Sequence, residues 1–223
     1  MMKSILVAPL VVASFLTWPS TKERPVDGFE LRGSASALDD DCIALTPDVR
    51  WASGSAWSKT PLDLDQPFDI RLGLGFGDKD QLGADGIVFA LAGDRRTGYR
   101  GEGLGYAGLR GSIGLELDTY QNHRQGDPAA DHLALLVDGS PYHHHRSSVV
   151  PLPNLEDGRR HALRVVWSPS ADTLEVFVDG TRAATYPGAL VREVLGSASP
   201  VSWGLTAGTG RKTNAHVACL DQP

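Results

Sequence analysis

The sequence predicts an all-β fold in which two antiparallel sheets pack face to face, as a jelly roll or a related sandwich. From Phe29 onward, short strand patterns are separated by Gly, Pro, Asp and Ser, and no segment keeps a helical period over ten residues or more. Short strands joined in this way are typical of two packed antiparallel sheets. The 223 residues, 41% of them hydrophobic, can bury one large core, so we expect a single domain.

The predicted strands run along the whole chain, and turn residues bound each of them. In chain order they cover residues 42–46, 68–75, 86–91, 113–119, 132–137, 161–167, 173–178, 201–207 and 216–220. The strand over 173–178 alternates strictly, because Leu174, Val176 and Val178 are separated by Glu175 and Phe177. The dipeptide at 179–180 is Asp-Gly, a hairpin turn that suits twisted antiparallel strands, and residues 168–172 form another turn.

The first twenty residues have the layout of a secretory signal peptide. A basic Lys3 precedes an apolar stretch over 5–16, and small or polar residues follow. The apolar stretch is too short to span a bilayer, and no other segment approaches that length. We therefore expect residues 1–20 to be removed near Ser20, a single domain over 26–223, and a periplasmic or extracellular destination. An N-terminal strand is the structural alternative.

The two cysteines lie in the first and last strands of this list. Export would allow Cys42 and Cys219 to oxidise, and the first and last strands of a sandwich often pair. A bridge between them would close nearly the entire domain and contribute about 5 kcal/mol in the loop-entropy model. Neither cysteine has the His-rich or Gly-rich surroundings of a catalytic thiol.

The charge balance limits the class of partner. The net charge is -6 and the chain lacks a dense run of Lys and Arg, which argues against nucleic acid or an anionic membrane surface. Divalent cations fit this balance better.

The segment 116–132, with the sequence ELDTYQNHRQGDPAADH, predicts a site for two metal ions. Because side chains alternate along a strand, Glu116 and Asp118 share one face, where their like charges repel unless a cation lies between them. The following loop can return Asn122, Asp127 and His132 to the same point. Oxygen donors suit calcium, and a set that includes imidazole suits a transition ion such as manganese.

Each of these residues also has an ordinary structural explanation, a solvated turn or a packed histidine. The triplet at 143–145 is three consecutive histidines, whose side chains point alternately in opposite directions on an extended chain. We interpret this triplet as an exposed loop.

Several motifs together resemble the L-type lectins, the legume lectin-like family of calcium-dependent sugar-binding proteins. They comprise an opening strand over 29–37, GSAW at 54–57, ADGIVF at 84–89, GEGLGY at 101–106, ELDTYQN at 116–122 with GDP at 126–128 and His132, and WGLTAGTG at 203–210. The resemblance covers nearly all of the chain after residue 25 and implies a concanavalin A-like jelly-roll sandwich, here in a secreted member of the bacterial type.

The resemblance also implies ligands for the two ions. Calcium would be held by Asp118, the backbone carbonyl of Tyr120, Asn122 and Asp127. The second ion, typically manganese, would be held by Glu116, Asp118, Asp127 and His132.

Carbohydrate recognition would fall to residues from several loops. Asp85 would accept hydrogen bonds from two sugar hydroxyls, Asn122 would donate one, and Tyr120 would offer its ring to the apolar face of the sugar. A backbone N–H would come from Gly103 first and Gly101 second. The loop that contains Gly208 and Arg211 would set specificity, and in the family the peptide before this aspartate is cis, so we expect a cis bond between Ala84 and Asp85.

Other functions stay open at this point. A glycoside hydrolase on the same sandwich could use Glu116 and Asp118, although the second acid that such enzymes carry on that strand face is replaced by Tyr120 and Asn122. A protein-interaction or adhesion domain with purely structural metal sites is the third class. For the lectin we expect glycans or glycoconjugates as partners and no catalysis, and pairing of subunits into a homo-oligomer is an arrangement that would add avidity.

Overall fold

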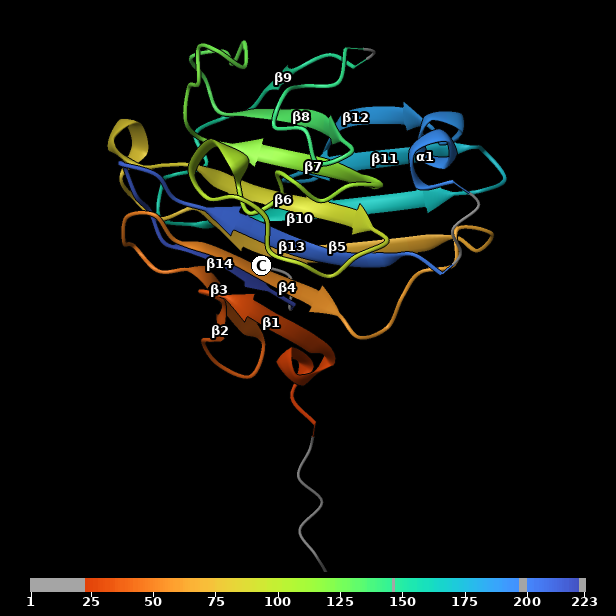
Figure 1. Cartoon of the computed structure of the whole chain (residues 1–223), viewed down its shortest axis with the longest axis horizontal. Helices are drawn as coiled ribbons and strands as arrows, with labels where there is room; N and C mark the ends of the chain where they lie inside the picture. Colours follow the sequence, from red (N-terminus) through yellow and green to blue (C-terminus); the bar gives the residue numbers. More distant parts are fainter. Residues whose placement is uncertain (1–22, 146, 197–199, 221–223) are drawn as a thin grey trace, which may run out of the picture.

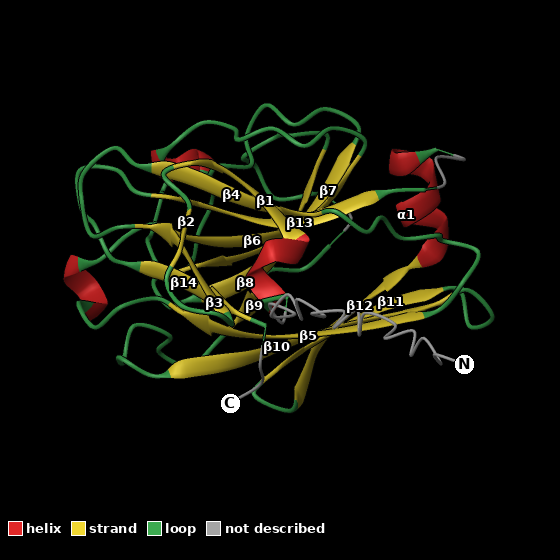
Figure 2. Ribbon diagram, turned by 90° about the horizontal axis from the view of Figure 1, so that it is seen from below, coloured by secondary structure: helices red, strands yellow, loops and turns green. Residues whose placement is uncertain are grey.

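The chain folds into two seven-stranded antiparallel sheets, seen in a computed structural model that describes residues 23–145, 147–196 and 200–220. Figure 2 shows the sheets as an upper and a lower layer, with the core between them. The predicted all-β sandwich is confirmed. The predicted signal peptide, residues 1–20, lies outside the described residues.

Each sheet takes strands from both halves of the chain (Figure 1). In spatial order, sheet A consists of β1 (Phe29–Gly33), β4 (Ser53–Ser58), β13 (Ser202–Gly208), β6 (Gly86–Ala92), β7 (Ser112–Asp118), β8 (His132–Val137) and β9 (Val150–Pro151). Sheet B consists of β12 (Thr181–Pro187), β11 (Thr173–Val178), β10 (Arg160–Ser168), β5 (Phe68–Gly75), β14 (His216–Cys219), β3 (Cys42–Thr46) and β2 (Ser36–Ala37). The helical segments are η1 (Pro25–Gly28), η2 (Asp80–Leu82), η3 (Gly101–Gly103) and α1 (Gly188–Leu195).

The nine strands predicted from residue patterns are all present, and their ends differ from the predictions by one residue at most. The patterns missed β12 because its residues are mostly polar and partly exposed, as befits the edge of sheet B. They also missed β2 and β9, which are two residues long. The strands β1 and β4 were expected only from the family resemblance.

Strand alternation separates two hydrophobic clusters. Ile87, Phe89 and Leu91 of β6 face sheet B in the main core, which also contains Leu115 and Leu117 of β7. The other face of sheet A is buried as well, because the long loop between β6 and β7 folds over it. A second cluster there consists of Trp57, Val88, Ala90, Ala92, Leu104, Tyr106, Leu109 and Leu136. Glu116 and Asp118 lie on this covered face.

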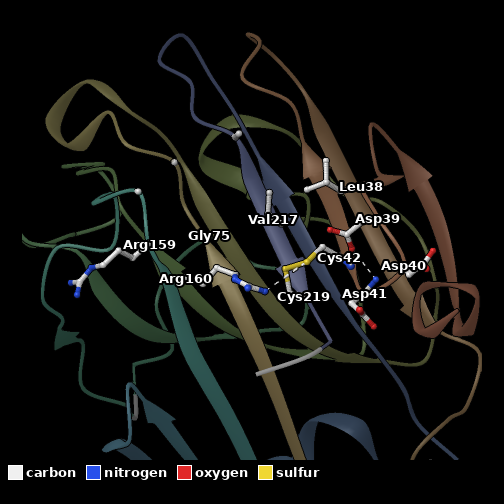
Figure 3. A pocket seen from close by; sticks show the side chains of 13 residues that line it. Leu38, Asp39, Asp40, Asp41, Cys42, Gly75, Arg159, Arg160, Val217 and Cys219 are labelled. Carbon is white, nitrogen blue, oxygen red and sulfur yellow. Dashed lines mark hydrogen bonds between the residues drawn. A yellow bond between two sulfur atoms is a disulfide. The ribbon is translucent and has the colours of Figure 1, made fainter. Parts of the chain in front are cut away.

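The disulfide joins the paired strands β3 and β14. Cys42 and Cys219 are opposite each other in the antiparallel register, and their sulfur atoms are bonded (Figure 3). The predicted bridge is confirmed. It closes 177 residues of chain.

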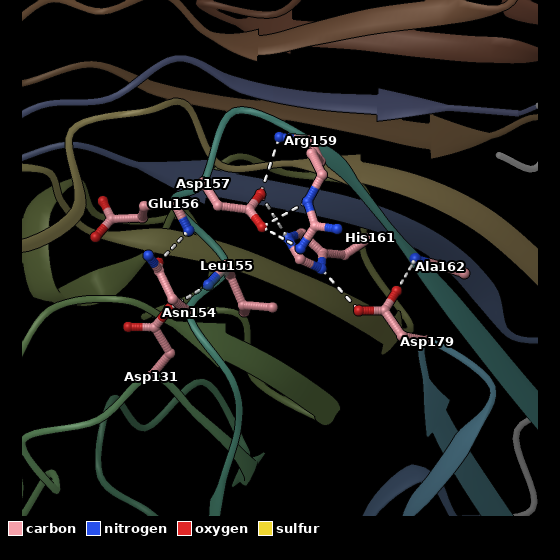
Figure 4. A network of polar contacts seen from close by, with 9 residues as sticks. All are labelled: Asp131, Asn154, Leu155, Glu156, Asp157, Arg159, His161, Ala162 and Asp179. Atoms are coloured by element: carbon pink, nitrogen blue, oxygen red, sulfur yellow. Dashed lines mark hydrogen bonds and ion pairs between the residues drawn. The ribbon is translucent and has the colours of Figure 1, made fainter.

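The hairpin between β11 and β12 has the predicted Asp-Gly turn. Asp179 and Gly180 both have positive φ, 48° and 77°, as a two-residue turn of this type requires. The Asp179 carboxylate accepts a hydrogen bond from the Ala162 backbone N–H and contacts Nδ1 of His161 at 2.8 Å, while Nε2 of His161 lies 3.2 Å from Asp157 (Figure 4). These contacts tie the hairpin turn to the start of β10.

The one α-helix of the described chain, α1, closes an end of the sandwich. It buries Leu190, Val191 and Leu195, and it contacts β7 of sheet A as well as β11 and β12 of sheet B. In the part of the chain that the structure describes, no helix combines the length and apolar character needed to cross a bilayer.

Candidate metal centre and binding cavity

The register of sheet A places five strand ends in one row. Ser53 of β4 pairs with Gly208 of β13, which pairs with Gly86 of β6; Asp118 of β7 and His132 of β8 continue the row. The segments that precede or follow these residues therefore meet at one edge of the sheet. This edge carries both the predicted metal ligands and a cavity.

Three carboxylates and a histidine form the centre of the predicted metal cluster. Glu116, Asp118 and Asp127 have exposed fractions of 2%, 1% and 6%, and His132 is 1% exposed. Single ligand atoms of Asp118, Asp127 and His132 lie within 4.8 Å of one another. The loop after β7 brings Asp127 back, since the Asp127 Oδ2 accepts a hydrogen bond from the Asn122 backbone N–H at 2.6 Å.

Burial opposes ionisation of this cluster. It raises the pKa of Asp118 well above its ordinary value, and the neighbouring charge of Glu116 adds to the effect. Burial also raises the pKa of Glu116, although contact with His143 partly offsets this. It lowers the pKa of His132, so that imidazole favours its neutral, metal-binding form.

The donor atoms fit divalent cations. Among the described residues, Glu116 Oε1, Asp127 Oδ1 and His132 Nε2 are buried without an aligned hydrogen-bond partner, and so is Asn122 Oδ1. Such atoms are costly unless something pairs with them. Together with the buried Asp85, the cluster would carry four negative charges when ionised, which two divalent ions would balance.

His143 joins this cluster, and our interpretation of the triplet as an exposed loop is wrong for this residue. Its Nε2 lies 3.0 Å from Glu116 Oε1 and 3.1 Å from Asp127 Oδ1, and its side chain is only 11% exposed. Strict alternation does not hold here, because it would place His145 on the same side as His143, whereas His145 is exposed. The sequence did not reveal which of three adjacent histidines would face inward.

Asp85 lies beside the cluster and directly precedes β6. Its backbone N–H donates to the Gly208 carbonyl at 3.1 Å, and its own carbonyl accepts the Thr119 backbone N–H at 2.9 Å. The peptide bond between Ala84 and Asp85 is cis, as expected. The carboxylate is 3% exposed, and its Oδ2 has no hydrogen-bond partner within the described chain. Burial, aided by the charge of Glu102, raises its pKa to about 7.

A cavity of about 400 Å³ opens over Asp85. Of the residues predicted to bind carbohydrate, Asp85, Gly101, Tyr120, Asn122 and Arg211 line it. The remaining lining residues are Trp51, Ala84, Arg100, Glu102, Arg124, Gly210 and Lys212.

Two predicted glycines do not line the cavity. Gly103 donates its N–H to the Arg100 carbonyl at 3.3 Å, and it is absent from the lining. Gly208 is a site of close packing, since a Cβ there would lie 3.0 Å from the Leu104 Cα and 3.1 Å from the Gly101 carbonyl oxygen. The structure therefore places Gly208 under η3, as a support for Asp85 and Gly101.

Trp51 is a lining residue that the sequence patterns missed. It is 49% exposed, has a positive φ of 63°, and donates its backbone N–H to the Gly210 carbonyl at 3.2 Å. The Arg100 guanidinium lies 5.7 Å from the centre of its ring. Tyr120 is less exposed than Trp51, and Lys212 Nζ lies 5.1 Å from the centre of its ring. The signal available in the sequence was a tryptophan outside every predicted strand, but nothing near Trp51 in the chain linked it to Asp85.

The lining also contains an ion pair. Arg124 makes two contacts of 3.0 Å with the carboxylate oxygens of Glu102, and both side chains are substantially exposed. Glu102 and Asp85 are the carboxylates of the cavity.

A larger hollow of about 710 Å³ lies beside the disulfide and shares no lining residue with this cavity (Figure 3). Its acidic edge is a turn in which Asp39 Oδ1 accepts the backbone N–H groups of Asp41 and Cys42. None of the unpartnered buried polar atoms of the described chain belongs to it. The candidate site is therefore the cavity over Asp85.

Comparison with curated proteins shows a partial relative. Over 102 residues, 44% of this chain, the sequence is 37% identical to the pesticidal crystal protein Cry22Aa of Bacillus thuringiensis. The chain spans about 14% of the length of that protein.

Solved structures with the same fold include lectins, at low sequence identity. The lectin of Bauhinia forficata, in complex with GalNAc, has a TM-score of 0.74 at 19% identity, over 88% of this chain and 91% of that one. Lectin II of Ulex europaeus has a TM-score of 0.73 at 19% identity, over 86% and 90%. The exoplasmic/lumenal domain of VIP36, in a form bound to Ca²⁺ and mannose, has a TM-score of 0.69 at 20% identity, over 90% and 87%.

The family model of the legume lectin beta-barrel domain, the L-type lectin domain, matches residues 20–222. This match covers most of the chain and includes every strand of both sheets. The chain belongs to the legume lectin family.

Proposed function

We propose that this protein is a calcium-dependent lectin, which binds carbohydrate without cleaving it. The observation that carries the proposal is the Asp85 carboxylate, which is buried and unpartnered beneath a cavity lined by polar and aromatic side chains. Membership of the legume lectin family supports it. So do the sugar ligands of the Bauhinia forficata lectin and of VIP36.

Calcium would be held by Asp118, Asn122, Asp127 and the carbonyl of Tyr120, an all-oxygen set suited to a hard cation. The ion would supply positive charge that stabilises the ionised carboxylates and orders the loop after β7. Asn122 supports this assignment, because its Oδ1 is buried and lacks a hydrogen-bond partner among the described residues. With that oxygen on the ion, the Nδ2 group would be left to donate to a ligand.

A second, manganese-type ion would take Glu116, Asp118, Asp127 and His132. The unpartnered atoms Glu116 Oε1, Asp127 Oδ1 and His132 Nε2 support this set within the described chain. Asp118 and Asp127 would bridge the two ions, so metal binding and loop order should be coupled.

Sugar hydroxyls would bind at the base of the cavity, and a sugar ring would rest against its aromatic wall. Ionised Asp85 would accept hydrogen bonds from two adjacent hydroxyls, and Asn122 would donate one. Gly101 lines the cavity, and a Cβ there would meet only Gly210 Cα, at 3.8 Å, so the backbone leaves room for a ligand. Trp51 and Tyr120 would contact the apolar face of the sugar.

Hydrolysis is the less favoured function. A retaining glycosidase needs two carboxyl groups about 5 to 5.5 Å apart, one of them free to donate a proton. The cavity carboxylates are Asp85 and Glu102, and Glu102 is held by Arg124 in a two-contact ion pair. Glu116 and Asp118 lie outside the cavity lining, in the metal cluster.

We also propose that the protein acts outside the cytoplasm, on glycans or glycoconjugates. The bond between Cys42 and Cys219 supports export, since disulfides persist in oxidising compartments. Assembly into homo-oligomers would raise avidity for clustered glycans, and it stays a prediction.

A glycan array with and without a chelator tests the proposal. Wild type should give signals that EDTA abolishes and calcium restores, and Asp85→Asn should give none. The matched control Asp65→Asn changes an exposed aspartate outside the cavity and should behave as wild type. Release of reducing sugar from a bound glycan would show an enzyme instead. Absence of every signal at all calcium concentrations would favour a protein-interaction domain.

A further inference from the structure

His143 reaches the metal cluster from a different part of the chain than the other donors. They come from β7, its following loop and the first residue of β8, whereas His143 lies in the loop between β8 and β9. The loop is held at the edge of sheet A, because the His144 backbone N–H donates to the Leu135 carbonyl at 2.7 Å. His143 thereby turns inward, and its ring packs edge-on against the His132 ring at a centroid distance of 5.4 Å.

The contacts of His143 have the spacing of atoms that share an ion. Its Nε2 lies 3.0 Å from Glu116 Oε1 and 3.1 Å from Asp127 Oδ1, and His132 Nε2 lies 3.9 Å from the same Asp127 oxygen. Ligands about 2.0 to 2.2 Å from one cation are separated by about 3 Å when adjacent and about 4 Å when opposite. All three separations fall in that range.

These contacts also lack the alignment of good hydrogen bonds. Within the described residues, Glu116 Oε1 and Asp127 Oδ1 have no aligned hydrogen-bond partner, although His143 Nε2 is close to both. Three buried carboxylates also outnumber the single charge that a protonated His143 would supply.

We propose that His143 is a ligand of the second ion, so that this site offers two imidazoles beside Glu116, Asp118 and Asp127. The inference concerns the metal centre and stands whether or not the cavity binds sugar. Imidazole nitrogen suits later transition ions better than manganese, so the second imidazole should shift the selectivity of this site toward Co²⁺, Ni²⁺ and Zn²⁺.

A rival explanation assigns His143 a different role in the same place. A protonated imidazole could act as a resident cation that neutralises the carboxylates and competes with the metal. The two explanations predict opposite effects of removing the side chain. A ligand that is removed weakens metal binding, and a competitor that is removed strengthens it.

The test measures metal binding directly. Affinities for Co²⁺, Zn²⁺ and Mn²⁺ are determined by competition with a chromophoric chelator for wild type, His143→Ala and His145→Ala, with calcium present to fill the other site. The exposed neighbour His145 provides the matched control. His143→Ala should lower Co²⁺ and Zn²⁺ affinity at least tenfold, because loss of even an outer partner of a metal ligand costs about 10- to 100-fold. The visible absorption bands of bound Co²⁺ should change in His143→Ala and not in His145→Ala.

A smaller loss of Co²⁺ and Zn²⁺ affinity in His143→Ala, no change, or tighter binding would overturn the proposal. If His143→Ala does not fold, as judged by circular dichroism, His143→Gln decides the question by the ratio of affinities. Glutamine keeps an oxygen donor of similar reach, so the preference for Co²⁺ over Mn²⁺ should fall at least tenfold. A ratio that falls less than this would equally overturn it.

Discussion

The buried carboxylate of Asp85 should destabilise the metal-free protein, and Asp85→Asn should relieve that cost while abolishing sugar binding. Burial raises the pKa of Asp85 from its ordinary 3.8 to about 7. Because the folded state holds this proton more tightly, stability is lost as pH rises from about 4 and levels off above pH 7. This pKa difference of about three units lowers the free energy of unfolding by about 4 kcal/mol at pH 8 and by about 2 kcal/mol at pH 5.

Urea denaturation in EDTA, followed by tryptophan fluorescence, measures this difference at both pH values. Asp85→Asn should exceed wild type in unfolding free energy by up to about 4 kcal/mol at pH 8 and by about half as much at pH 5. Calcium should reduce this difference in unfolding free energy between Asp85→Asn and wild type, because a nearby cation favours the ionised carboxylate. Sugar affinity should fall at least 100-fold, since two hydrogen bonds to a charged acceptor contribute about 3 kcal/mol or more.

The control Asp65→Asn should leave the unfolding free energy unchanged at both pH values. The reasoning from burial would be refuted if Asp85→Asn had the same unfolding free energy as wild type at pH 8. It would also be refuted if the substitution raised the unfolding free energy by the same amount at both pH values. Retained sugar affinity in Asp85→Asn would count against the proposed ligand role alone.

Three other perturbations probe separate parts of the structure. Trp51→Ala should weaken sugar binding roughly tenfold in calorimetry, with little effect on melting temperature, because Trp51 is half exposed in the cavity wall. Replacing Cys42 and Cys219 by serine should lower the unfolding free energy by up to about 5 kcal/mol in urea titrations, because the bridge closes most of the chain. Tyr106→Phe should cost about 1 to 3 kcal/mol, because its buried hydroxyl exchanges hydrogen bonds with Ser112.

Each of these has a plain contrary outcome. Sugar affinity unchanged in Trp51→Ala would remove this ring from the binding surface. A double serine variant as stable as the wild-type protein would mean that the disulfide adds nothing to the stability of the β3–β14 pairing. A Tyr106→Phe variant of wild-type stability would show that the hydroxyl network over sheet A adds nothing to folding.

Local patterns predicted what depends on one strand or one turn. Leu174, Val176 and Val178 are buried and their neighbours are not, as period-two alternation requires. The face shared by Glu116 and Asp118 followed from the same rule. The bridge between Cys42 and Cys219 is not local: it was predicted because an early and the last predicted strand of a sandwich often pair, and β3 does pair with β14.

Patterns could not reveal that both faces of sheet A are covered. Leu104, Tyr106 and Leu109 of a distant loop pack on the face of sheet A that also carries the buried Glu116. That loop is rich in glycine and has no strand or helix period, so its sequence does not predict that its side chains pack into a hydrophobic cluster. Its packing depends on tertiary contacts with the strands of sheet A.

The sequence by itself determined nine of the strands and the face that Glu116 and Asp118 share, because these depend on alternation and on residues close together in the chain. Only the tertiary structure brought Trp51 and Asp85 to one cavity and turned His143 toward Glu116. The physical reason is the register of sheet A, which aligns the ends of five strands and so joins loops that lie far apart in the sequence.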